Sequence, residues 1–178
     1  VIDWVESRSD LDASRIAVFG PSLGGFNALF VASLDERVKV VVPALAGGPL
    51  PGVLMESDER RIKEAVDEAK TELSMDDEQL MQHLVDKIQS DPLMLAPHVN
   101  ANRVLMVLAK HDKAVPYESQ VRLWQAMGEP EAISLPTGHV TAAAYLFYLR
   151  SQVRKFFDRK LAEPDAYGTA VIADGVCS

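Results

Sequence analysis

The segment RIAVFGPSLGGFNALFVASL, residues 15–34, decides the fold. Its first six residues form a short apolar run with β-branched and aromatic side chains, which predicts a strand buried on both faces. Apolar residues then recur at helical spacing, which predicts a helix. Between the two, Ser22 stands between Gly20 and Gly24. A single hydroxyl at such a position is either an ordinary turn residue or a nucleophile.

The two glycines have a steric explanation. A sharp strand-to-helix turn strains the backbone of the serine and brings neighbouring chain segments close together. Side chains in place of Gly20 and Gly24 would collide there, which favours glycine at both positions. The turn also puts Ser22 at a helix N-terminus, where N–H groups and the helix dipole favour a developing negative charge. A G-x-S-x-G string arises by chance in roughly one chain of this length in twenty, so the predicted strand-to-helix context is the stronger signal.

Three further apolar segments predict strands, and helical segments alternate with them. The predicted strands cover residues 37–48, 102–110 and 131–136. Strands that alternate with helices predict an α/β fold with a parallel sheet. Residues 53–91 are charged and helix-favouring throughout, with Ser74 and the acids after it as candidate N-caps. We expect two helices outside the sheet there, which form either a cap or a solvated excursion with no role in binding.

Composition and charge exclude several classes of protein. The chain has 178 residues, 48% of them hydrophobic and 25% charged, which is typical of one globular domain. A net charge of -8 disfavours nucleic acid and anionic membranes as partners. No apolar run approaches the roughly 20 residues of a membrane span. No signal peptide is visible in the residues given, and a cytoplasmic location is slightly favoured.

Neither a metal nor a cofactor is expected. The single cysteine, Cys177, cannot build a disulfide framework or a cysteine-based zinc site. His83 and His98 have no partner at metal-ligand spacing on a shared face. The glycines of residues 46–52 lack the lysine and hydroxyl that a phosphate loop requires.

The chain offers Ser22 a base and an orienting acid. A serine hydroxyl is a poor nucleophile unless a base takes its proton, and the base needs an acid that orients it. Asp112 follows the predicted strand at 102–110, and His139 follows the one at 131–136. Each of the three residues therefore stands beyond the carboxyl end of its own strand, where ligands bind in open α/β sheets.

Each candidate also has a structural alternative. Ser22 could be only a turn residue, and His139 could cap the last helix. Asp112 could form an Asx-turn, which its turn-prone surroundings allow. Asp91, which precedes Pro92, is a rival for the acid, although an aspartate in that setting is commonly a helix cap.

These segments resemble the C-terminal part of an α/β-hydrolase, with features of dienelactone hydrolases and prolyl-oligopeptidase-type esterases. GPSLGG is similar to the nucleophile elbow of that family, HDKAVP to its acid turn and GH to its histidine loop. The resemblance implies that Ser22 is the nucleophile, His139 the general base and acid, and Asp112 the partner of the histidine. It also implies that the backbone N–H of Leu23 is one donor of the oxyanion hole.

The resemblance covers residues 1–161 and sets the expected domain organisation. It implies a partial α/β-hydrolase domain with about four parallel strands, a helical insert at 53–91 and a tail at 162–178. The family places further strands, and the second oxyanion donor, ahead of its elbow. We therefore interpret the chain as a fragment of a longer enzyme rather than a naturally truncated relative. By itself it is expected to be weakly active or inactive.

The function expected from these observations is that of a serine hydrolase. Its substrate would be a small-molecule carboxylic ester, cleaved through an acyl-enzyme intermediate. Cleavage of peptides or thioesters on the same fold is the first alternative. A non-catalytic module that keeps the fold for binding is the second.

Overall fold

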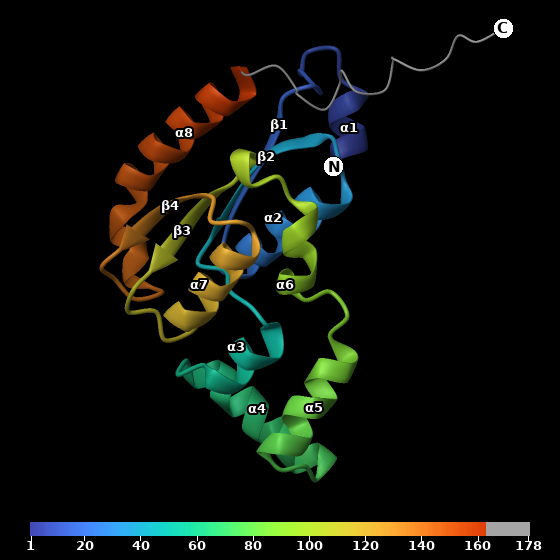
Figure 1. The fold of residues 1–178 in the computed structure, drawn as a ribbon, viewed down its shortest axis with the longest axis vertical. Helices are drawn as coiled ribbons and strands as arrows, with labels where there is room; N and C mark the ends of the chain where they lie inside the picture. The colour runs from blue at the N-terminus through green and yellow to red at the C-terminus, as the bar shows by residue number, and fades with distance from the viewer. Residues whose placement is uncertain (163–178) are drawn as a thin grey trace, which may run out of the picture.

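The computed structural model describes residues 1–162 (Figure 1). Of the predicted tail at 162–178, only Ala162 lies within this range, as the last residue of a helix. Cys177 lies outside the described residues. The strands are β1 (Ile16–Pro21), β2 (Val38–Ala44), β3 (Leu105–Ala109) and β4 (Glu131–Leu135), and the helices are α1 (Ile2–Glu6), α2 (Leu23–Leu34), α3 (Leu50–Glu56), α4 (Arg60–Leu73), α5 (Asp77–Lys87), α6 (Pro92–Leu95), η1 (Ala96–His98), η2 (Ala101–Arg103), α7 (Tyr117–Ala126), η3 (Thr141–Tyr145) and α8 (Leu146–Ala162).

The four strands form one parallel sheet in the order β1-β2-β3-β4. This confirms the predicted fold class, about four parallel strands with flanking helices. Every strand is followed by at least one helix, and so the chain returns each time to the same edge before the next strand starts. The carboxyl ends of all four strands therefore lie together, which brings distant loops into contact.

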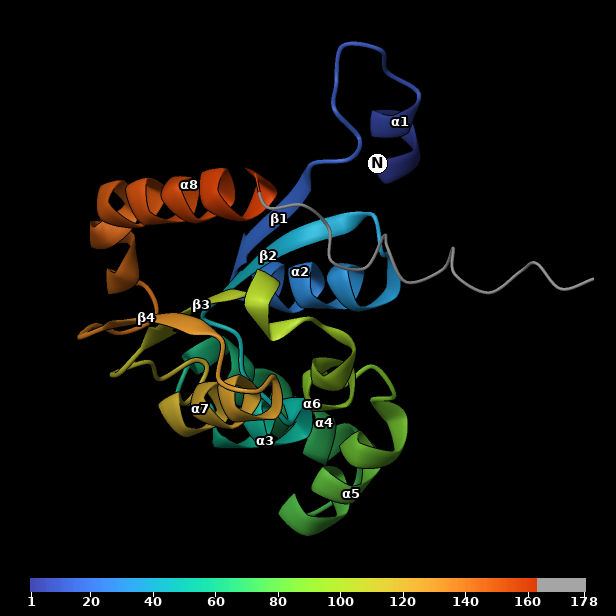
Figure 2. The same cartoon turned by 45° about the horizontal axis from the view of Figure 1, so that its top comes forward.

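Helices cover both faces of this sheet. Val40 and Val42 of β2 pack in one cluster with residues of α8, whereas Val41 packs in a second cluster with residues of α2 and α7. Figure 2 shows α8 on one side of the sheet and α2 on the other. Successive side chains of a strand point to opposite faces, so the buried residues 40–44 of β2 and the whole of β3 are apolar.

The prediction that residues 15–20 form a strand buried on both faces is only partly correct. Residues 16–18 of β1 are half-buried, and the side chain of Phe19 is 43% exposed. The reason is the position of β1 at the edge of the described sheet, where β2 is its neighbour on one side. Burial on both faces applies instead to β2 and β3.

Residues 53–91, the predicted helical insert, contain the second half of α3 and the whole of α4 and α5, and α6 follows them. In Figure 1, α4 and α5 extend beyond the sheet, past α3. Asp76 is the N-cap of α5 and forms a capping box with Gln79, whereas Ser74 ends α4 in a left-handed conformation. One of the acids after Ser74 is therefore the cap, not Ser74 itself.

Within residues 1–162, no helix combines the length and the apolar character that a membrane span requires.

Candidate active site

Ser22 occupies the turn between β1 and α2 in a strained conformation. Its φ of 54° and ψ of -124° are rare for a residue with a side chain. Its N–H donates to the carbonyl of Ala44 at 2.8 Å, and its carbonyl accepts from the N–H of Gly25 at 2.7 Å. Strand β2 and the first turn of α2 thus fix the backbone and leave the hydroxyl at the carboxyl edge of the sheet.

The close packing that this turn requires explains its glycines. A Cβ on Gly20 would lie 2.0 Å from the carbonyl oxygen of Gly24, which no side chain can tolerate. A Cβ on Gly24 would lie 3.3 Å from Cδ of Pro21, which is tight but less severe. The sequence reasoning missed Gly25, where a Cβ would lie only 2.7 Å from the carbonyl oxygen of Ala44. The glycine pair after the serine was the available signal, since the second glycine allows α2 to approach β2.

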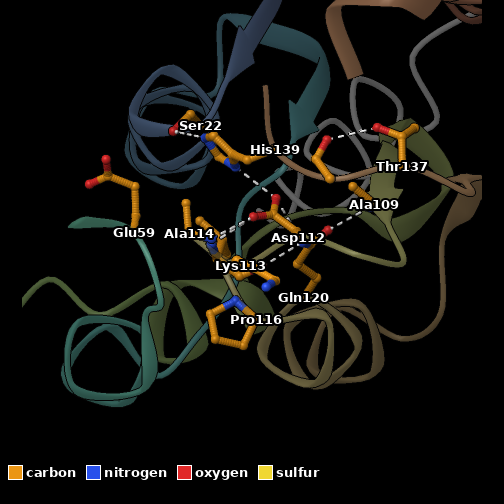
Figure 3. Close-up of polar contacts among 12 residues, drawn as sticks. Ser22, Glu59, Ala109, Asp112, Lys113, Ala114, Pro116, Gln120, Thr137 and His139 are labelled. Atoms are coloured by element: carbon orange, nitrogen blue, oxygen red, sulfur yellow. Dashed lines mark hydrogen bonds and ion pairs between the residues drawn. The ribbon is translucent and has the colours of Figure 1, made fainter. Parts of the chain in front are cut away.

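Ser22, His139 and Asp112 form one chain of hydrogen bonds (Figure 3). Nε2 of His139 lies 2.8 Å from Oγ of Ser22, and Nδ1 lies 2.7 Å from Oδ2 of Asp112. The Asp112 side chain has no exposed surface, and that of His139 is 21% exposed. Ser22 follows β1, Asp112 follows β3 and His139 follows β4. The parallel sheet thus brings together Ser22 and His139, which are 117 positions apart in sequence.

The carboxylate of Asp112 makes two different sets of contacts. Its Oδ1 accepts hydrogen bonds from the N–H groups of Ala114 and Val115, each at 2.9 Å. These bonds form the Asx-turn that was the alternative interpretation of Asp112. Its Oδ2 faces His139. The loop therefore both fixes the carboxylate and leaves one of its oxygens for the imidazole, and the two interpretations of Asp112 are compatible.

Among the described residues, Asp91, the rival candidate for the acid, bonds to backbone N–H groups and not to a histidine. Its carboxylate accepts the N–H of Leu93 at 2.8 Å as the N-cap of α6, and the N–H of Leu50 at 2.5 Å. Leu50 is where the chain enters α3, and Asp91 is where it returns from α5. Asp91 therefore joins the two ends of the insert, and the imidazole of His139 is paired with Asp112 instead.

The N-terminus of α2 lies next to Ser22, which is the N-cap of this helix. Leu23 is the first residue of α2, and the first N–H groups of a helix have no acceptor within it. Its N–H can therefore donate to an oxygen that binds next to Ser22. The positive end of the helix dipole adds to this effect.

A cavity of about 620 Å³ opens beside Ser22 and His139. Its walls are mostly apolar side chains from α2 and from the segment between β2 and β3. Among these are Phe26, Phe30, Val53, Leu54, Ile62 and Leu95.

The link between α3 and α4 is hydrogen-bonded to the loop between β3 and α7, which carries Asp112. The N–H of Asp58 donates to the carbonyl of Lys113 at 2.6 Å, and Ser57 beside it is 1% exposed. Glu59 and Arg61 bring charge to the cavity at this point. The insert therefore contacts the loop that carries Asp112.

No group of three or more His, Cys, Asp or Glu side chains in the part of the chain that the structure describes is arranged to hold a metal ion.

A parallel sheet with a strained serine at a strand-to-helix turn, followed in the chain by an acid loop and a histidine loop, defines the α/β-hydrolase fold. The predicted relationship to that superfamily is supported by solved structures. No family model matches the chain.

Two solved structures and one sequence relative illustrate the similarity. The acetyl xylan esterase of Paenibacillus sp. R4 is 25% identical with a TM-score of 0.71, and the match covers 89% of this chain and 49% of the esterase. The acylaminoacyl peptidase of Pyrococcus horikoshii is 15% identical with a TM-score of 0.71, over 92% of this chain and 27% of the peptidase. The uncharacterized protein Rv2627c of Mycobacterium tuberculosis is 27% identical, over 92% of this chain and 36% of its own length. The chain thus spans less than half the length of each of these proteins.

Proposed function

We propose that the protein is a serine hydrolase that cleaves carboxylic esters through an acyl-enzyme intermediate. The observation that carries this proposal is the hydrogen-bonded chain from Ser22 Oγ through the His139 imidazole to Asp112. The fold it shares with an esterase and a peptidase supports the same class of reaction.

In the proposed first step, Oγ of Ser22 attacks the carbonyl carbon of the ester. Nε2 of His139, which is 2.8 Å from Oγ, takes the serine proton as the new C–O bond forms. Asp112 keeps the other ring proton on Nδ1, so Nε2 is free to accept. The carbonyl oxygen becomes an oxyanion, which the N–H of Leu23 stabilises at the end of α2.

The second half of the reaction returns the proton. The imidazolium of His139 protonates the alcohol oxygen as its bond to carbon breaks, and this leaves an acyl group on Ser22. Water then enters, and His139 takes its proton as the water attacks the acyl carbon. Collapse of that intermediate releases the acid and restores the serine hydroxyl.

An ester with an apolar acyl or alcohol group fits the cavity best. Burial of apolar surface is the main source of binding energy in a pocket of this kind. Esters are favoured over amides because an alkoxide is a better leaving group than an amide anion, so less assistance is needed from the site. Peptides and thioesters are the alternative substrates.

Fluorophosphonate labelling of the intact protein tests the class of enzyme. Ser22 should be phosphonylated, and mass spectrometry should find the adduct on the peptide that contains it. A p-nitrophenyl butyrate should be hydrolysed faster than the p-nitroanilide with the same acyl group. A protein that reacts with neither the fluorophosphonate nor the two chromogenic substrates would be a non-catalytic binding module instead.

We further propose that the insert at 53–91 is a cap that selects the substrate. Ile62→Trp should narrow the cavity beside α4, since Ile62 lines it. We expect kcat/KM for a p-nitrophenyl octanoate to fall about tenfold more than for the acetate, as a few methylene groups are excluded. Val66→Trp, one turn further along α4, is the matched control. Equal losses for both esters would mean that the insert has a structural role only.

A further inference from the structure

Gln120 is a fully buried polar residue on the inner face of α7. It precedes Leu123 and Met127 by three and seven positions, so it belongs to the same buried stripe of the helix. A polar side chain on such a stripe must satisfy its hydrogen bonds internally. Those bonds are made to the last residue of β3 and to the loop after it, which carries Asp112.

The contacts of the Gln120 amide fix its orientation. Its Oε1 accepts the N–H of Ala109 at 3.0 Å, so the oxygen must point there. Its Nε2 donates to the carbonyl of Val115 at 2.8 Å. The second proton of the same nitrogen points to Oδ2 of Asp112, 3.3 Å away. Gln120 thus connects the end of β3 at Ala109 with Asp112 and Val115 in the loop that follows.

The same oxygen of Asp112 faces both Gln120 and His139. Nδ1 of His139 lies 2.7 Å from Oδ2, and Nε2 of Gln120 approaches that oxygen as a second donor. The other oxygen, Oδ1, is held by two backbone N–H groups. Rotation of the carboxylate would break contacts on both oxygens.

We propose that Gln120 is a positioning residue that keeps Oδ2 of Asp112 directed at the His139 imidazole. It acts through Asp112 and does not touch the substrate. This inference rests on the proposed function, because it assigns Gln120 a part in the same hydrolysis. Without the amide, Oδ2 loses one of its two donors and the loop loses its bond to α7, so the carboxylate can shift although Oδ1 is still held. A small misplacement of a catalytic group slows a reaction strongly.

Two variants of the intact protein test the proposal. Gln120→Met keeps the length of the side chain and removes all three hydrogen bonds. Gln120→Glu keeps an acceptor for the N–H of Ala109 but loses the amide donors. Both should lower kcat for p-nitrophenyl butyrate by about 10- to 100-fold, with KM within twofold of the original value. Ser119→Ala is the matched control, since Ser119 is the neighbouring buried residue and bonds the carbonyl of Pro116 instead. It should leave kcat unchanged.

A combination with Asp112→Asn separates positioning from a merely structural role. If Gln120 acts through the carboxylate, Gln120→Met should cost less than about twofold in kcat once Asp112 is already replaced, because coupled residues are not additive. A structural role would cost the same in both backgrounds, and that result would overturn the proposal.

The remaining outcomes are also decisive. An unchanged kcat in either folded variant would overturn the inference, and so would failure of both variants to fold, since Gln120 would then act on stability. In both cases the unsubstituted protein would still hydrolyse the ester, so the proposed function would stand. A protein that neither hydrolyses the ester nor reacts with fluorophosphonate would overturn both.

Discussion

Replacing Ser22 by alanine is expected to abolish ester hydrolysis, with a loss in kcat of about 10⁶-fold. Alanine keeps the Cβ and so leaves the strained backbone at φ 54° with the same neighbours. What it removes is the only atom that bonds Nε2 of His139 in the described site. The reaction then has no nucleophile that His139 can deprotonate, and the remaining N–H of Leu23 can stabilise only an attack by water.

The measurement is the steady-state hydrolysis of p-nitrophenyl butyrate by the intact protein, with thermal unfolding as a check on the fold. Ser33→Ala is the matched control, because Ser33 lies on the same helix and bonds the carbonyl of Phe30 within it. That variant should keep the full rate. Residual activity above a few per cent in the Ser22 variant would place the nucleophile elsewhere.

The sheet was predictable because its signals are local. Short apolar runs mark β2, which proline and glycine close, and β3, and their alternation with helices predicts parallel strands. The glycine before Ser22 was predictable for the same reason, since a turn of this sharpness leaves no room for a Cβ at position 20.

Local patterns alone do not predict the contacts between distant elements, and the pairing of Asp112 with His139 was expected only from the resemblance to a known family. Asp91 lies between α5 and α6, Asp112 lies in the loop after β3, and nothing local says which of them faces a histidine. The cavity also depends on where α3 and α4 pack, which periodicity does not indicate. Gln120 left a detectable sign, a polar residue in line with Leu123 and Met127. Only the folded protein shows which groups are its hydrogen-bond partners.

Replacing Asp112 by asparagine is expected to lower kcat by about 10⁴-fold while the fold stays intact. The new side chain can keep an oxygen for the N–H groups of Ala114 and Val115, so the loop retains its shape. An NH₂ group then stands where Oδ2 faced His139, and it donates instead of accepting. The imidazole must turn its unprotonated nitrogen towards this group. Its other nitrogen then carries a proton and cannot accept one from Ser22.

Asp91→Asn is the matched comparison, because both aspartates are buried and both accept backbone N–H groups. Its carboxylate joins the ends of the insert, so this variant should lower the unfolding temperature and change kcat by less than about fivefold. Saturating p-nitrophenyl butyrate gives kcat for the two variants under the same conditions. If Asp91→Asn were the slower enzyme, the orienting acid would be at the start of α6. The hydrogen bond between Asp112 and His139 would then contribute to folding rather than to catalysis.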